Sequence, residues 1–173
     1  MPSTPTPTPS LCSSEDEEIE ITTLSNTVDT NKSPVFDSTE SSDLIDHEVF
    51  DQLVEMDDDD DDFSRSIILN YFDQAESTFG EMDKALKSKD LNKLSQLGHF
   101  LKGSSAAIGL IKVKASCEKL QHYGNLKDET GTKSISEELA LRKIEPLLKG
   151  VKEEYKEAED YLRRFYRERE TSS

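Results

Sequence analysis

Cysteine and positive charge are scarce in this chain of 173 residues, and long apolar runs are absent. The two cysteines, Cys12 and Cys117, cannot build a disulfide framework and fit no zinc spacing, so we expect a reducing compartment. No run approaches the roughly 18 apolar residues of a membrane-spanning helix, and no signal peptide follows Met1. Because 37 acidic residues outnumber 21 basic ones, the net charge is -16, which argues against nucleic-acid binding. These absences predict a soluble, non-secreted protein without membrane or nucleic-acid partners.

Residues 1–42 contain no glycine and no periodic apolar pattern, which predicts a disordered tail. The segment holds five of the six prolines, 17 serines or threonines, and an acidic patch from Glu15 to Glu20. It has too few apolar side chains to offset an ordering entropy of roughly 1 to 2 kcal/mol per residue. We place the ordered domain at residues 43–168 and expect residues 169–173 to be disordered.

The remaining apolar positions recur at helical spacing, and we find no convincing period-two alternation. The pattern predicts a short helix at about 44–56, long amphipathic helices at 63–87, 90–107 and 111–124, and a last helix after the loop 125–136. Pro146 should either kink the last helix or divide it into two. The predicted fold class is therefore all-α, an antiparallel four-helix bundle with an additional short N-terminal helix.

Six consecutive aspartates, Asp57 to Asp62, separate the short helix from the next one. Metal binding is one interpretation, but a contiguous run lacks the spaced ligands and turn glycine of a calcium loop. The other interpretation is a charged joint whose last members cap the following helix and favour its N-terminus electrostatically. We favour the joint and assign no metal site.

The helix at 90–107 carries an unusual exposed side. At 100° per residue, its leucines fall within about 60° of one direction, which defines the buried face. His99 lies about 140° from that direction and Gly103 about 180°, so both face outward. A glycine within a helix costs about 0.5–1 kcal/mol relative to alanine, and Phe100 is a large apolar side chain away from the buried face. This geometry alone fits a functional histidine and an ordinary surface histidine equally.

The segment LGHFLKGSSAAIGL, Leu97 to Leu110, resembles the active-site signature of histidine-containing phosphotransfer (HPt) proteins, particularly the stand-alone fungal phosphorelay intermediates. The segment MDDDDDDFS, Met56 to Ser64, resembles the acidic joint of those fungal proteins. The resemblance covers about residues 44–125 closely and the last helix loosely. It implies a four-helix bundle whose single phosphorylatable histidine exchanges phosphoryl groups with receiver-domain aspartates.

The resemblance also implies roles for five residues. His99 corresponds to the phospho-accepting histidine, and Lys102 to the lysine that balances phosphoryl charge. Gly103 corresponds to the glycine that leaves clearance, Ser104 to the hydroxyl beside it, and Gln121 to the glutamine that orients the imidazole. The wheel places the serine hydroxyls at or near the buried face, so we expect them to bond within the helix.

Two positions differ from the family pattern or have a plain structural interpretation. Fungal relatives tend to carry an arginine near the end of the helix at 111–124, where this sequence has Asn125, with Lys127 nearby. Lys102 is then expected to balance more of the phosphoryl charge alone. Cys117 shares an apolar face of that helix, which favours a small buried hydrophobe over a redox thiol.

The resemblance further implies the partners. These are receiver domains of a hybrid histidine kinase and of response regulators, with Mg²⁺ supplied by the receiver and no intrinsic cofactor. No P-loop or kinase motif set is present, so the chain is not expected to bind ATP or to be a kinase in its own right. We expect docking through Phe100 and Ala106, joined by Val49 and Leu53 if these do not merely close the bundle end.

A non-catalytic helical adaptor, in which His99 is incidental, is the alternative function. It predicts no acid-labile phosphate and normal partner binding by His99→Gln. A histidine kinase fragment is disfavoured because 173 residues leave no room for a catalytic domain beside the bundle. We expect a monomer of the cytoplasm and nucleus.

Overall fold

The computed structural model describes residues 44–57 and 62–172, and within these ranges its regular elements are all helices. In chain order they are α2 (His47–Val54), α3 (Phe63–Lys87), α4 (Leu91–Ala107), α5 (Ile111–Gly124) and α6 (Glu137–Ser172). The ranges of α3 and α5 match the predicted ones at both ends. None of the described helices combines the length and the hydropathy that a membrane span requires. The predicted disordered tail, residues 1–42, lies outside the described residues.

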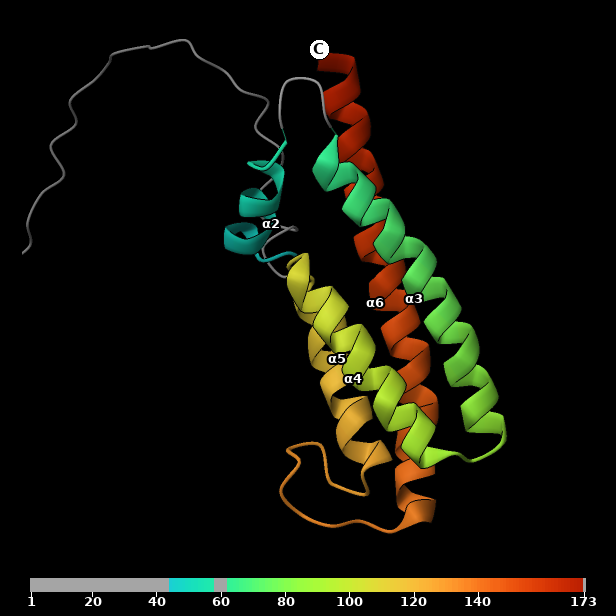
Figure 1. Ribbon diagram of the computed structural model, residues 1–173. Helices are drawn as coiled ribbons and strands as arrows, with labels where there is room; N and C mark the ends of the chain where they lie inside the picture. Colours follow the sequence, from blue (N-terminus) through green and yellow to red (C-terminus); the bar gives the residue numbers. More distant parts are fainter. Residues whose placement is uncertain (1–43, 58–61, 173) are drawn as a thin grey trace, which may run out of the picture. The chain divides into compact units, whose positions relative to one another are not determined.

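Helices α3, α4, α5 and α6 form a bundle in which sequential helices run antiparallel (Figure 1). Each helix packs against the next, and α6 returns to pack against α3, so the four enclose one apolar core. Fully buried side chains from all four helices meet there, among them Ile68, Met82, Leu94, Leu101, Leu120, Ile144 and Leu162. The predicted four-helix bundle with an additional short helix is confirmed.

Helix α2 is fixed by backbone hydrogen bonds to the turn between α4 and α5. The amide of Asp46 donates to the carbonyl oxygen of Gly109 at 2.7 Å, and the amide of Ile111 donates to Leu44 at 3.1 Å. Gly109 has a φ of 81°, and an added Cβ would lie 2.8 Å from the Asp46 carbonyl oxygen. Both its conformation and this close approach therefore require glycine. The side chain of Asp46 also caps α2 by accepting from the amide of Glu48 at 3.1 Å.

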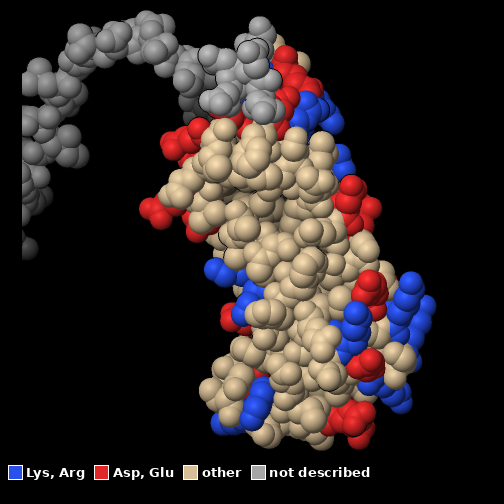
Figure 2. Space-filling view, viewed as in Figure 1, with Lys and Arg blue, Asp and Glu red and all other residues tan. Residues whose placement is uncertain are grey.

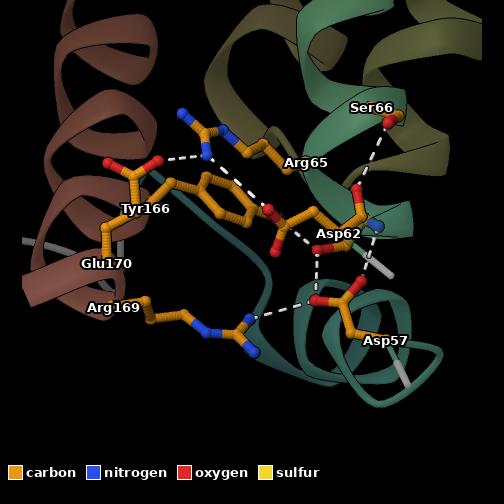
Figure 3. A network of polar contacts seen from close by, with 8 residues as sticks. Asp57, Asp62, Arg65, Ser66, Tyr166, Arg169 and Glu170 are labelled. Carbon is orange, nitrogen blue, oxygen red and sulfur yellow. Dashed lines mark hydrogen bonds and ion pairs between the residues drawn. The ribbon is translucent and has the colours of Figure 1, made fainter. Parts of the chain in front are cut away.

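Asp57, the first residue of the aspartate run, joins the start of α3 to the end of α6 (Figure 3). Its carboxylate accepts from the amide and hydroxyl of Ser64 at 2.6 and 2.7 Å, and from Arg169 at 3.1 Å. Ser64 is fully buried and shares a further hydrogen bond with the Tyr166 hydroxyl at 2.7 Å. Burial raises the pKa of Asp57, but the Ser64 hydrogen bonds and the Arg169 charge together hold it below its ordinary value of 3.8.

The prediction that the last aspartates of the run cap α3 is contradicted for the side chain of Asp62, the one residue at that end of the run that the structure describes. Asp62 occupies the cap position without a capping hydrogen bond from its side chain, and it pairs with Arg65 instead. The amide of Ser64 lies in the first turn of α3 and has no acceptor within the helix. It donates instead to Asp57, at the other end of the aspartate run. Residues 58–61 lie outside the described ranges.

Helix α6 continues through Pro146 and beyond the predicted end of the domain. Division into two helices, one of the two predicted alternatives, is excluded, and the proline lies at an exposed position. The prediction that residues 169–173 are disordered is wrong for 169–172, which are helical. Ion pairs of Arg65 with Glu170 and of Arg169 with Asp57 hold these last turns beside the start of α3 (Figure 3).

Candidate functional site

Helix α4 presents His99 to solvent and buries its opposite face. Asp90 caps the helix by accepting from the amide of Lys93 at 2.9 Å. The predicted stripe is buried, and its members on the helix are Leu91, Leu94, Leu97, Leu101 and Ser105. His99 is exposed, and its ring makes no hydrogen bond or ion pair with any other residue in the described ranges. The imidazole is therefore accessible to a second molecule.

Two glycines of α4 have opposite surroundings. A Cβ added at Gly98 would lie 2.8 Å from the Leu120 side chain and 3.1 Å from the Cys117 carbonyl oxygen, because α5 packs directly against it. A Cβ added at Gly103 would meet nothing within 4 Å. Helix packing therefore requires Gly98, whereas no contact within the fold requires Gly103. The surface at Gly103, one helical turn from His99, is open.

Helix α5 contributes two polar side chains beside this part of α4. Its backbone lies against Gly98, since an added Cβ there would be 3.1 Å from the amide nitrogen of Gln121. Lys102 of α4 donates to Glu118 of α5 at 3.4 Å. The Oε1 atom of Gln121 is buried and has no hydrogen-bond partner in the described part of the chain. Its role in orienting His99 stays a prediction, because no hydrogen bond joins the two side chains here.

The hydroxyls of Ser104 and Ser105 bond within the protein, as predicted. Each donates to the carbonyl oxygen four residues earlier, at 3.3 and 2.7 Å. Ser104 also donates to Gln74 Oε1 at 3.2 Å, and Ser105 shares a hydrogen bond with the Tyr71 hydroxyl at 2.9 Å. Sequence reasoning missed both α3 partners, because helical spacing does not show which residues of one helix face the serines of another.

The predicted docking residues differ in exposure. Phe100 is 47% exposed, and Val49 and Ala106 are half-buried. Leu53 is only 8% exposed, so the prediction that it faces a partner is wrong. It follows Phe50 by three residues on one face of α2, and both side chains belong to the core. The alternative interpretation, that α2 closes the bundle end, holds for Leu53.

The side of the bundle formed by α2 and α4 carries little charge. Figure 2 shows a broad area free of lysine, arginine, aspartate and glutamate, with charged side chains at its border. Helix α4 has two charged residues, Lys93 and Lys102, which pair with Glu81 at 3.0 Å and Glu118 at 3.4 Å. In a chain of net charge -16, a helix without carboxylates of its own lowers the repulsion that an acidic partner meets along α4.

The other reactive side chains near α5 are buried or hydrogen-bonded within the fold. Burial raises the pKa of the Cys117 thiol to about 12, consistent with the predicted small buried hydrophobe. His122 Nδ1 donates to the Glu129 carbonyl oxygen at 2.9 Å, which fixes the loop after α5. Lys127 donates to Ser134 in the same loop at 3.2 Å. Within the described ranges, no cluster of three metal-ligating side chains is present.

Comparison with protein families identifies this arrangement. A family model described as the Hpt domain matches residues 66–163, more than half of the chain. The chain belongs to the HPt domain family. The match contains α4 and α5 entirely, and therefore both helices that surround His99. The resemblance drawn from the segment around His99 is confirmed.

Fungal phosphorelay proteins are among the relatives of this HPt chain. Multistep phosphorelay regulator 1 of Schizosaccharomyces pombe is 56% identical over 125 residues, covering 71% of this chain and 42% of that protein. Phosphorelay intermediate protein YPD1 of Saccharomyces cerevisiae is 46% identical over 88 residues, covering 50% of this chain and 53% of that one. The chain thus spans about half the length of these relatives.

A solved structure gives the same fold. It is a co-crystal structure of the Saccharomyces cerevisiae histidine phosphotransfer signaling protein Ypd1 with the receiver domain of its downstream response regulator Ssk1. Its Ypd1 chain superposes with a TM-score of 0.64 at 33% identity, covering 72% of this chain and 95% of that chain.

Proposed function

We propose that this HPt protein is a phosphorelay intermediate. It accepts a phosphoryl group on His99 from a receiver-domain aspartate and passes it to an aspartate of a response regulator. The observation that carries the proposal is the exposed imidazole of His99 beside open space at Gly103, on a helix without carboxylates. The fungal relatives, which are named for phosphorelay, and the structure of Ypd1 with a receiver domain support it.

The proposed transfer is an in-line displacement at phosphorus. A lone pair on one imidazole nitrogen of His99 forms the N–P bond while the O–P bond of the aspartyl phosphate breaks. The electron pair of that bond stays on the aspartate, which leaves as a carboxylate. The ring, which retains the proton on its other nitrogen, becomes cationic or releases that proton to solvent. Onward transfer runs the same steps in reverse with a second receiver.

Each neighbouring residue has a physical role in this proposal. Gly103 leaves clearance for the receiver surface, and Lys102 supplies positive charge to the phosphoryl oxygens. Gln121 offers a buried oxygen with no hydrogen-bond partner among the described residues. This oxygen can accept the ring N–H and so decide which nitrogen is free to react. The Ser104 hydroxyl is bonded to Gln74 and within α4, so its contribution is to the local packing of the site.

The partners are receiver domains, which bring the acidic pocket and the Mg²⁺ ion. Because there is one reactive histidine, the donor and acceptor receivers must use the same surface in turn. Phe100 is the exposed apolar contact on α4, with Val49 and Ala106 as partly exposed neighbours. We also propose a place in the cytoplasm and nucleus, where such partners would be met. A bundle that buries its own apolar faces supports a monomer.

The test mixes the full chain with a phosphorylated receiver domain and Mg²⁺. The chain should acquire phosphate that is acid-labile and alkali-stable, and His99→Gln should acquire none. The matched control is His47→Gln, which changes another exposed histidine on α2 and should be phosphorylated like the unaltered chain. Equal labelling of His99→Gln and His47→Gln would refute His99 as the acceptor, whereas no acid-labile label on the unaltered chain would favour the helical adaptor.

A further inference from the structure

The ion pair of Lys102 with Glu118 is the charged contact between α4 and α5 nearest to Gly103. Lys102 Nζ lies 3.4 Å from Glu118 Oε1, and the two side chains are 26% and 49% exposed. Lys102 follows His99 by three residues, so the two side chains are neighbours on the helix surface. Glu118 precedes Gln121 by three residues and is its neighbour on α5 in the same way. Histidine, lysine, glutamate and glutamine therefore form one cluster across two helices.

The single positive charge of Lys102 cannot serve two anions equally. In the unphosphorylated protein its ammonium is directed toward Glu118. A phosphoryl group on His99 would place roughly one and a half to two negative charges beside the same ammonium. Helix α4 itself contains no carboxylate, so Glu118 is the anion that the structure sets against the phosphoryl group for this lysine.

We propose that Glu118 is a positioning residue that competes with the phosphoryl group of His99 for Lys102. This inference rests on the proposed function. By stabilising the unphosphorylated state through its ion pair, Glu118 lowers the equilibrium share of phosphoryl held on His99 relative to the receiver aspartate. A ligand shifts an equilibrium by its differential interaction with the two states, and here the Lys102–Glu118 pair favours the empty state. The consequence is a carrier that releases its phosphoryl group more readily.

The experiment measures the equilibrium partition of labelled phosphoryl between a receiver domain with Mg²⁺ and the full chain. Glu118→Gln removes the carboxylate with little change in shape. We expect the ratio of phosphorylated HPt protein to phosphorylated receiver to rise about two- to fivefold, the range for loss of one exposed ion pair. The rise should shrink at high salt, which screens exposed charges.

The matched control is Glu157→Gln. Glu157 pairs with Lys112 between α5 and α6 at 3.8 Å, so the control makes the same charge change in another interhelical pair. It should leave the partition unchanged. Lys102→Ala should lower the share on the HPt protein, and adding Glu118→Gln to Lys102→Ala should have little further effect.

Each outcome decides a separate point. Equal partition for Glu118→Gln and Glu157→Gln, in a chain that is phosphorylated normally, would overturn the competition alone. A full rise that persists in the Lys102→Ala background would also overturn it, because Glu118 would then repel the phosphoryl group without acting through Lys102. Absence of any label on the unaltered chain would instead overturn the proposed function, and this inference with it.

Discussion

Gly103 offers a way to separate folding from phosphoryl transfer on one helix. An added Cβ there meets nothing within 4 Å, and the same is true of Gly80 on α3. Alanine is the better helix former by about 0.5–1 kcal/mol, so Gly103→Ala and Gly80→Ala should both stabilise the fold by about that amount. For a domain of this size, the melting temperature should rise by about 2–6 °C.

Gly98, five residues earlier on α4, should respond to alanine in the opposite way. A Cβ there would lie 3.1 Å from the backbone carbonyl of Cys117 and 3.1 Å from the amide nitrogen of Gln121, and neither backbone atom can move without shifting α5. Gly98→Ala should therefore lower the free energy of unfolding by about 1–3 kcal/mol, as overpacking of a core does. Thermal and urea unfolding of the three alanine variants would measure this contrast.

A larger side chain tests clearance for a partner. Gly103→Gln should fold normally but slow phosphoryl transfer from a receiver domain about 10- to 100-fold, because reacting atoms displaced by about 1 Å lose that much rate. Gly80→Gln is the matched control and should transfer at the normal rate. Rapid-quench assays would measure the rate of phosphoryl transfer from the receiver domain to each of the two variants. A normal rate for Gly103→Gln, or a lower melting temperature for Gly103→Ala, would refute the reasoning.

Two other predictions concern the elements around the site. Asp57→Asn should lower the free energy of unfolding by about 1–3 kcal/mol at pH 7, because buried Ser64 and Arg169 lose a charged partner. Since the pKa of Asp57 is lowered, its contribution to the free energy of unfolding is complete at neutral pH and is lost as the pH falls below 3.8. Urea unfolding at a series of pH values should therefore show the stability difference between Asp57→Asn and the unaltered chain becoming smaller below that pH. A stability difference that stays constant with pH would contradict this. Leu53→Ala should destabilise the fold by about 2–4 kcal/mol, whereas Phe100→Ala should weaken receiver binding and change stability by less than about 0.5 kcal/mol. Unfolding and binding titrations would measure both, and weaker receiver binding by Leu53→Ala without loss of stability would place Leu53 in the docking surface.

The local parts of the site could be read from the chain because they depend on one helix at a time. The spacing of the leucines of α4 places His99 and Gly103 on the exposed side, and the structure has them there. The docking prediction for Leu53 was wrong because the short helix α2 gives a weaker pattern. A helix of eight residues has too few apolar positions to show which of them faces the bundle. The face of α2 that is buried is decided by its position against the α4–α5 turn.

Contacts between distant segments were not readable in this way. The pattern of the aspartate run favours its last members as caps, yet it is Asp57 that accepts the hydrogen bond from the Ser64 amide in the first turn of α3. The bond from Ser104 to Gln74 and the pair of Lys102 with Glu118 depend on how far one helix is shifted along another. Side-chain periodicity fixes the face of a helix but leaves that shift free.

The amino-acid sequence alone determined the helices, the buried stripe of α4, the outward imidazole and, through its resemblance, the HPt family. Only the tertiary structure decided which charges and hydroxyls meet beside His99, that Leu53 belongs to the core, and that α6 reaches Ser172. Helix formation follows from the repeat of neighbouring residues, whereas these contacts require the packing of four helices into a single register.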